Sequence, residues 1–335
     1  MPAMTPSRTI SSRGALAALL LPLALVALAF ATTSVAVASS AGAGCTGGYG
    51  WPVKPFDRAH PIRGAFGDPR TVFDGASSAK TVLAADGRFS FHHGVDISAP
   101  DATPVYAVAS GTVVRTHGNR VTVDCGNGRI FEYWHLEPAT RVGRHAEAGK
   151  TLLGYIQEKR EHVHLRHIEA GRSVNPVAGN RLTPYSDSTV PEVLRISARR
   201  DGHRIAFVAR AVDMPSLPVP GRWHGFPVTP ALVTWRIQTR GGRVVVPTRV
   251  ARDVRETIPS GDQFWTTFAR GSHQNWPVFT DGKARGMTGR YVFRLTSGWL
   301  DTRGLADGRY VLVVVAQDTE GNRDVRRLRF DLSSS

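Results

Sequence analysis

The sequence predicts a mainly β protein, in which an antiparallel β-sheet domain is followed by a β-sandwich. Short runs rich in valine, isoleucine, tyrosine and phenylalanine recur along the chain, separated by turns rich in glycine, aspartate and asparagine. Residues 47–187 show no convincing helical hydrophobic pattern of more than three turns. With 335 residues, the chain is long enough for two domains, each with its own core.

The first 38 residues are expected to form a signal peptide. Two arginines precede an apolar run over residues 15–31, and a cleavage signal of small residues, Ala-Val-Ala, follows at positions 36–38. We expect cleavage after Ala38, which makes the protein secreted or places it in the cell envelope, without a membrane span. An uncleaved membrane anchor is the alternative, and Pro22 within the apolar run argues against it.

Residues 47–186 are expected to form the first domain, an antiparallel β-sheet. Its clearest β-type runs lie at residues 105–108, 111–114, 120–123 and 130–133. The segment Asp124-Cys125-Gly126-Asn127-Gly128 is a strong turn signal between the last two runs. This half is therefore predicted to be mainly β.

Residues 188–335 are expected to form an accessory β-sandwich, after a polar junction at residues 180–191. Alternating runs lie at residues 192–198, 204–211, 231–238, 243–250, 291–297, 310–316 and 325–332. The last hairpin is typical of an immunoglobulin-like module. Asp318 and Glu320 in its turn could bind Ca²⁺, but a plain hairpin turn accounts for them better.

The two cysteines, Cys45 and Cys125, are expected to form one disulfide, because an even number of cysteines in an exported protein favours pairing. The bridge would join the mature N-terminus to the first domain. Two unpaired thiols are the alternative.

The chain is basic, with a formal net charge of +15. Residues 187–335 contribute +9 (23 basic against 14 acidic), and residues 39–186 contribute +4 (17 against 13). A basic second domain in an exported protein favours anionic wall polymers or phospholipid headgroups as partners. A generally arginine-rich composition would give the same excess. Export and the lack of a nucleic-acid-binding motif argue against nucleic acid as a partner.

Four histidines and one aspartate carry the strongest functional signal in the chain. They are His92, Asp96, His135, His162 and His164. The first two form an H-x-x-x-D pair and the last two an H-x-H pair. Imidazole and carboxylate are zinc ligands, and three of them leave a tetrahedral site one position for water. The other imidazoles suit acid–base work, because histidine changes charge near neutral pH.

The H-x-H spacing is informative on a strand, because residues i and i+2 point to the same face. His162 and His164 would then enter one groove, where one could hold metal while the other faces water or substrate. His135 follows a β-type run and could lie at the rim of the same groove.

The order H-x-G-V-D, then Y-x-H-L, then H-x-H resembles the lysostaphin/LytM-type zinc metallopeptidases, which cut peptide bonds in bacterial peptidoglycan. Three further segments agree with this family: residues 60–70 resemble its s-x-F-G-x-R segment, residues 94–113 its G-v-D-i-a-a-p … t-P-V-y-A … G-x-V run, and residues 174–176 its V-N-P. The resemblance covers about residues 50–180, and it implies a LytM-like β-sheet domain with one zinc ion per chain.

The resemblance also implies a role for each residue of the pattern. It makes His92, Asp96 and His164 the zinc ligands, and His135 and His162 the catalytic pair that orients the water and stabilises the oxyanion. His92 is preferred to His93 because of its spacing to Asp96. His93 is expected on the other side of the strand, and His167 is interpreted as the family's variable apolar position.

Two departures from the family pattern concern the substrate. A charged segment at residues 157–161 replaces the usual Gly/Ser/Thr-rich loop before H-x-H, which alters the groove wall and could select a different cross-link. Leu165-Arg166 replaces the usual F-E after it, so a carboxylate that could support a ligand is missing. Glu132 or Glu169 could take its place.

The sequence therefore predicts an exported zinc metallopeptidase that hydrolyses the peptide cross-links of bacterial peptidoglycan. A non-enzymatic peptidoglycan-binding or amidase-activating protein, which uses the same groove, is the alternative. A surface adhesion protein that acts through residues 188–335 is a third hypothesis.

Overall fold

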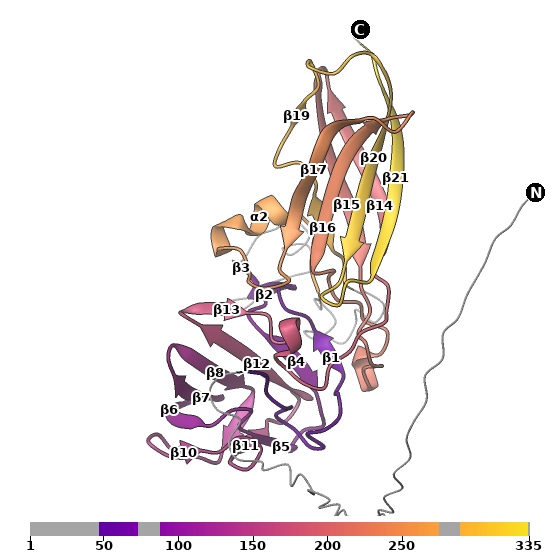
Figure 1. Ribbon diagram of the computed structural model, residues 1–335. Coiled ribbons are helices and arrows are strands. Elements are labelled where there is room, and N and C mark those ends of the chain that lie inside the picture. Colours follow the sequence, from indigo (N-terminus) through magenta and orange to yellow (C-terminus); the bar gives the residue numbers. More distant parts are fainter. Residues whose placement is uncertain (1–46, 73–87, 275–288, 334–335) are drawn as a thin grey trace, which may run out of the picture. The chain divides into compact units, whose positions relative to one another are not determined.

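The computed structural model describes residues 47–72, 88–274 and 289–333 (Figure 1). The predicted signal peptide and Cys45 lie outside these residues. The described residues belong to one compact unit, and about half of them lie in antiparallel strands, so the chain is mainly β, as predicted. The helical segments among them are short: η1 (Ala178–Asn180), η2 (Gly221–Trp223), η3 (Gly261–Gln263) and α2 (Phe264–Thr267).

An eight-stranded antiparallel sheet forms the centre of the first half (Figure 1). Its strands follow the order β1-β4-β12-β8-β7-β6-β10, and β13 pairs with β12. Their bounds are β1 (Ile62–Gly64), β4 (Val95–Ser98), β6 (Gly111–His117), β7 (Arg120–Gly126), β8 (Arg129–Trp134), β10 (His145–Ala146), β12 (His162–Glu169) and β13 (Arg172–Val174). The turn predicted between β7 and β8 is present, and Asn127 and Gly128 have the positive φ angles of 53° and 74° that a tight hairpin requires.

Two smaller sheets complete this half. One has the order β5-β11-β9, and the other is a hairpin of β2 and β3. Their bounds are β2 (Pro69–Val72), β3 (Arg88–Phe91), β5 (Pro104–Tyr106), β9 (Leu136–Pro138) and β11 (Leu152–Ile156). The paired strands β2 and β3 lie in the sequence between Gly67 and His92.

Two four-stranded antiparallel sheets make up the second half. One has the order β14-β15-β18, with β19 also paired to β15, and the other the order β17-β16-β20-β21. Their bounds are β14 (Glu192–Asp201), β15 (Arg204–Val212), β16 (Leu232–Thr239), β17 (Val244–Asp253), β18 (Val292–Arg294), β19 (Leu300–Asp301), β20 (Gly308–Gln317) and β21 (Arg323–Leu332). All seven predicted runs overlap these strands. The immunoglobulin-like arrangement and the domain boundary at residue 187 remain predictions.

The central sheet buries one of its faces. Val163 and Leu165 on β12 are fully buried, as is Ile97 on β4, and all three belong to the core of this half. Because side chains alternate across a strand, the residues between them point to the opposite face. His162, His164 and Asp96 therefore share that opposite face.

Candidate metal and catalytic site

The three predicted metal ligands meet at one point on the central sheet. His92 follows β3, Asp96 lies on β4, and the register of β12 places His164 directly opposite Asp96. His92 Nε2 lies 2.8 Å from His164 Nδ1 and 3.1 Å from Asp96 Oδ1. His164 Nδ1 lies 3.1 Å from the same carboxylate oxygen. Three potential donor atoms thus converge.

The spacing and burial of this cluster fit a zinc ion. Its three donor atoms lie within 4.8 Å of one another. Ligand atoms around tetrahedral Zn²⁺ are separated by about 3.3–3.6 Å, which is close to the observed distances. Burial lowers the pKa of His92 to about 3, so its imidazole is in the neutral form that a metal requires. Two histidines and one aspartate are also a donor set that zinc accepts.

Two neighbouring groups orient the ligands. His92 Nδ1 donates a hydrogen bond to the carbonyl oxygen of Ala65 at 2.8 Å, which leaves the Nε2 lone pair facing the cluster. Arg70 donates to Asp96 Oδ2 at 2.5 Å. Burial opposes ionisation of Asp96, but the charges of Arg70, His92 and His162 and a hydrogen bond from His164 together outweigh it and keep the pKa of this carboxyl well below its usual range.

Neither Glu132 nor Glu169, the two carboxylates that could have supported a metal ligand, does so. Glu132 accepts hydrogen bonds from Arg166 at 3.1 Å and from Arg120 at 3.3 Å, and Glu169 lies beside His167 and Arg129. Neither contacts a residue of the triad in the described structure. Arg70 and the Ala65 carbonyl support the ligands instead.

The two predicted catalytic histidines lie next to each other and beside the triad. The ring centroids of His135 and His162 are 4.5 Å apart, and His162 Nε2 lies 3.7 Å from Asp96 Oδ1. His135 follows β8 with a φ of 68°, a strained backbone conformation of the kind found at functional sites. Burial lowers the pKa of His135 to about 4 and that of His162 well below its usual value. Both imidazoles are therefore neutral at pH 7.

The other two histidines of these motifs are not part of the cluster of donor atoms. His93 is exposed, and the charges of Arg166 and His164 act on its ring. His167 is fully buried and stacks on Phe131 with a ring-centroid distance of 4.6 Å. Tyr49 and Arg129 also hydrogen-bond its ring. His167 therefore packs in the core behind the sheet.

The charged loop at residues 157–161 is tied to two different parts of the chain. The carboxylate of Asp101 accepts hydrogen bonds from the backbone N–H groups of residues 159, 160 and 161, at 2.6, 3.1 and 2.8 Å. At the end of the loop, Glu161 accepts two hydrogen bonds from Arg222 of η2, at 3.0 and 2.9 Å. A segment of the second half thus contacts the loop that precedes His162.

The sequence did not single out two further residues of the site. Arg63 of β1 places Nη2 at 2.7 Å from His162 Nδ1, and its guanidinium lies 3.5 Å from the ring centroid of Trp223. Burial lowers the pKa of Arg63 to about 9. Arg63 lies in the segment 60–70 that resembles the family, but it is not one of the residues that define the motif, and Trp223 lies 160 positions further along the chain, so no local pattern could have paired them.

Cys125 lies half-buried at the end of β7. Its predicted partner, Cys45, lies outside the described residues, so the disulfide remains a prediction. The helices in the described part of the chain are all too short, or too polar, to cross a membrane.

The antiparallel sheet thus presents a His-Asp-His cluster that could hold a metal ion, beside two imidazoles that burial keeps neutral. Residues 90–176, which contain all five residues, match peptidase family M23. The resemblance of this part of the chain to the LytM-type peptidases is therefore confirmed.

Several solved structures are similar to the chain. One is a zinc-containing peptidase from Vibrio cholerae (20% identity, covering 38% of this chain and 39% of that chain, TM-score 0.31). Others are LytU (23% identity, 37% and 86% covered, TM-score 0.26) and lysostaphin (15% identity, 57% and 78% covered, TM-score 0.25). The chain spans only 39% of the length of the first of these. A search of curated proteins finds no match.

Proposed function

We propose that the chain is an exported zinc-dependent endopeptidase that hydrolyses peptide cross-links of bacterial peptidoglycan. The observation that carries this proposal is the convergence of the donor atoms of His92, Asp96 and His164 beside the paired rings of His135 and His162. The M23 match over the same residues supports the reaction class. Export rests on the predicted signal peptide.

His92, Asp96 and His164 would hold the metal. Bound Zn²⁺ would supply Lewis acidity at this point of the groove. Asp96 provides negative charge to offset the cation, while Arg70 fixes the orientation of its carboxylate.

His135 and His162 would handle the proton and the developing charge. Both are neutral at pH 7 because they are buried, so either ring nitrogen that lacks a hydrogen can accept a proton from the attacking water. The opposite tautomer can donate a hydrogen bond to the oxygen that gains negative charge as the peptide carbonyl is attacked. Their centroid separation of 4.5 Å lets both rings reach one substrate carbonyl.

The basic second half would attach the protein to anionic wall polymers. Exposed arginines line the outer strand β21, at positions 323, 326, 327 and 329. A row of cations along one strand attracts a polyanion by long-range electrostatics. Retention of the protein on isolated cell walls should then fall as salt is raised, and salt-independent retention would contradict this role.

The enzymatic proposal is tested with the purified protein and isolated peptidoglycan. We expect about one Zn²⁺ per chain and release of soluble wall fragments, whose mass spectra identify the bond that is cut. His135→Ala should abolish release and keep the metal, whereas Asp96→Ala should lose both. Full release by His135→Ala would show that the assignment is wrong. Binding to peptidoglycan without any release would favour the non-enzymatic alternative.

A further inference from the structure

Arg63 lies between His162 of the candidate catalytic pair and Trp223 of the second half of the chain. Its guanidinium contacts the ring of His162 on one side, at 2.7 Å, and the indole of Trp223 on the other, at 3.5 Å. Only 7% of the residue is exposed. A cation is therefore held beside the imidazoles at which peptide hydrolysis would occur.

This guanidinium has hydrogen-bonding capacity that the described residues do not use. Arginine carries five N–H donors, and among the described residues neither Nε nor Nη1 of Arg63 has an acceptor. Buried polar groups, and buried charges above all, are normally paired. The donors that lack an acceptor indicate that an anion belongs at this position when the groove is in use.

The carboxylates nearest to Arg63 are already engaged elsewhere. Asp96 gives Oδ2 to Arg70 and Oδ1 to the two histidine ligands. Glu161 binds Arg222 through both of its oxygens. Among the described residues, neither of these carboxylates is free to accept from Arg63, which points to an acceptor on a bound molecule.

We propose that Arg63 binds a carboxylate of the substrate peptide, so that the groove selects peptides with a free acid next to the cleaved bond. This inference rests on the proposed function and narrows its substrate class. Acid-bearing stem peptides would be favoured over neutral, glycine-type bridges. Guanidinium–carboxylate hydrogen bonds are charge-assisted and directional, which suits Arg63 to this selection.

The segment around Trp223 controls access to Arg63. Nε and Nη1 are not exposed to solvent while the indole covers the guanidinium, so a substrate carboxylate reaches them only when this segment shifts. The Arg222–Glu161 ion pair that fastens the segment is half exposed on both sides, and such surface pairs are weak. Substrate can therefore displace it.

Binding of two matched ligands tests the proposal. The probes are a cross-linked stem-peptide dimer with free α-carboxylates and the same dimer with these groups converted to carboxamides. Titration calorimetry is run on the full-length His135→Ala protein with Zn²⁺ present, so that neither dimer is cut. We expect the carboxylate dimer to bind about tenfold tighter or more, and we expect R63Q in the same background to bind both dimers equally.

Three control variants separate recognition from folding and from general charge. Removal of an exposed cation by R172Q should leave the preference intact, whereas R63K, which keeps the charge but loses the planar fork, should keep only part of it. R222Q, which releases Glu161, gives Arg63 an acceptor from the chain itself and should therefore reduce the preference for the carboxylate dimer. If R63Q unfolds at the assay temperature, R63K alone decides: an undiminished preference in R63K overturns the proposal.

The outcomes distinguish this inference from the proposed function. Equal binding of the two dimers, no binding of either dimer, or a preference that survives R63Q overturns the role of Arg63. If wild-type protein releases wall fragments but shows no preference, only this inference is wrong. If the preference is found but the wild type releases nothing, the role of Arg63 stands and the enzymatic function fails.

Discussion

Arg70 is the single residue whose side chain most directly orients the candidate metal ligands. Its guanidinium donates to Asp96 Oδ2 at 2.5 Å, which leaves Oδ1 to face the two imidazoles. The position usually filled by a carboxylate after H-x-H is occupied by Arg166, which binds Glu132 and Ser173 and does not contact the triad. The side chain that orients a metal ligand therefore lies on β2, and not on β12 as in the family pattern.

Replacing Arg70 by methionine should therefore weaken zinc binding while the fold is retained. Loss of a residue that orients a metal ligand typically costs about 10–100-fold in metal affinity, and we expect a loss in that range. Competition titration with a zinc-binding dye measures it. The matched change Arg166→Met should alter the zinc affinity by less than a factor of about three; an equal loss in both variants would mean that Arg70 has no special role.

The sequence predicts the residues of the site that share a local spacing, but not those that meet only in three dimensions. H-x-x-x-D and H-x-H place ligands by chain spacing and by the two-residue period of a strand, and the structure brings all of them together. Arg63 and Trp223 meet because β1 pairs with β4 and because η2 of the second half packs beside it. No local pattern contains that information.

At the scale of the strand, the register between β4 and β12 builds the site. Asp96 lies opposite His164, and His164 in turn lies opposite Trp134 of β8, the residue before His135. A shift of one residue would send His162 and His164 into the core. The strands themselves were predictable from composition, but their ends were less so. For example, β18 ends at Arg294. Beyond it, the Thr296 hydroxyl accepts a hydrogen bond from the Phe207 N–H, in place of a backbone carbonyl of a longer strand.

Gly94 allows β4 to approach β12 in this register. A Cβ at this position would overlap the backbone carbonyl of Leu165, and rigid backbone cannot move aside as a side chain can. Gly94→Ala should therefore destabilise the protein by about 3 kcal/mol or more, at the upper end of overpacking effects, and should weaken zinc binding as well. Urea unfolding measures the first effect and metal titration the second.

Gly118 provides the control for this change. It lies in the turn between β6 and β7, where an added Cβ meets no atom within 4 Å, although its φ of 57° is left-handed. Gly118→Ala should cost only about 1 kcal/mol, from backbone strain alone. A similar loss of stability in both variants would show that the close approach at Gly94 is not what makes it necessary.

At the scale of the whole molecule, the second half supports the segment that positions His92. Arg252 of β17 is almost fully buried, and it donates to the Gly67 carbonyl at 3.1 Å and to Thr229 at 2.9 Å. Asp68 accepts hydrogen bonds from the N–H and hydroxyl groups of Thr229, and its backbone pairs with that of His92. The predicted accessory half is thus joined to the ligand segment by buried polar contacts.

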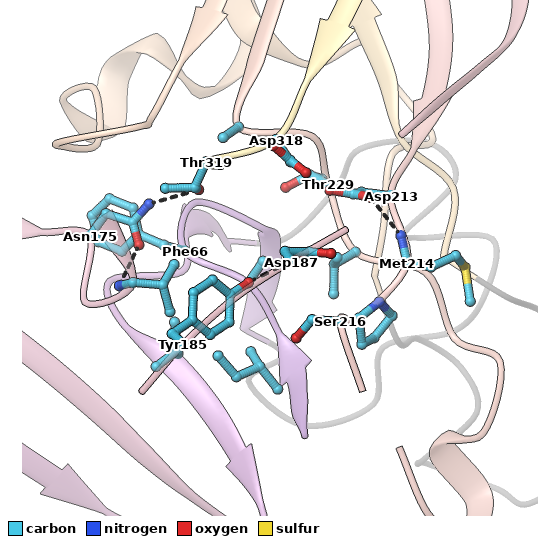
Figure 2. Close-up of a pocket in the computed structure, with 17 residues that line it drawn as sticks. Phe66, Asn175, Tyr185, Asp187, Asp213, Met214, Ser216, Thr229, Asp318 and Thr319 are labelled. Atoms are coloured by element: carbon cyan, nitrogen blue, oxygen red, sulfur yellow. Dashed lines mark hydrogen bonds between the residues drawn. The ribbon is translucent and has the colours of Figure 1, made fainter. Parts of the chain in front are cut away.

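A second consequence of this packing is a hollow in which three carboxylates face one another. Figure 2 shows Asp187, Asp213 and Asp318 in its lining, from the junction, the end of β15 and the turn after β20. Burial, followed by the charge of Asp187, raises the pKa of Asp213 to about 8. Asp318 and Asp68 act in the same direction, while the N–H of Met214 partly opposes the shift.

This raised pKa should make stability fall with pH. Asp213 holds its proton up to about pH 8 in the folded protein, whereas in the unfolded chain it loses the proton near its ordinary pKa of about 3.9. The folded state therefore binds more protons between these values, and the free energy of unfolding decreases as pH rises through that window. Asp213→Asn removes the titrating group. The melting temperature of this variant should therefore fall less than that of the wild type between pH 5 and pH 9, and the variant should be the more stable protein at pH 9.

Thermal unfolding measures this difference. EDTA is present so that divalent cations do not neutralise the carboxylates, and Asp262→Asn on exposed η3 is the control. Parallel pH profiles for all three proteins would show that Asp213 does not titrate in this range.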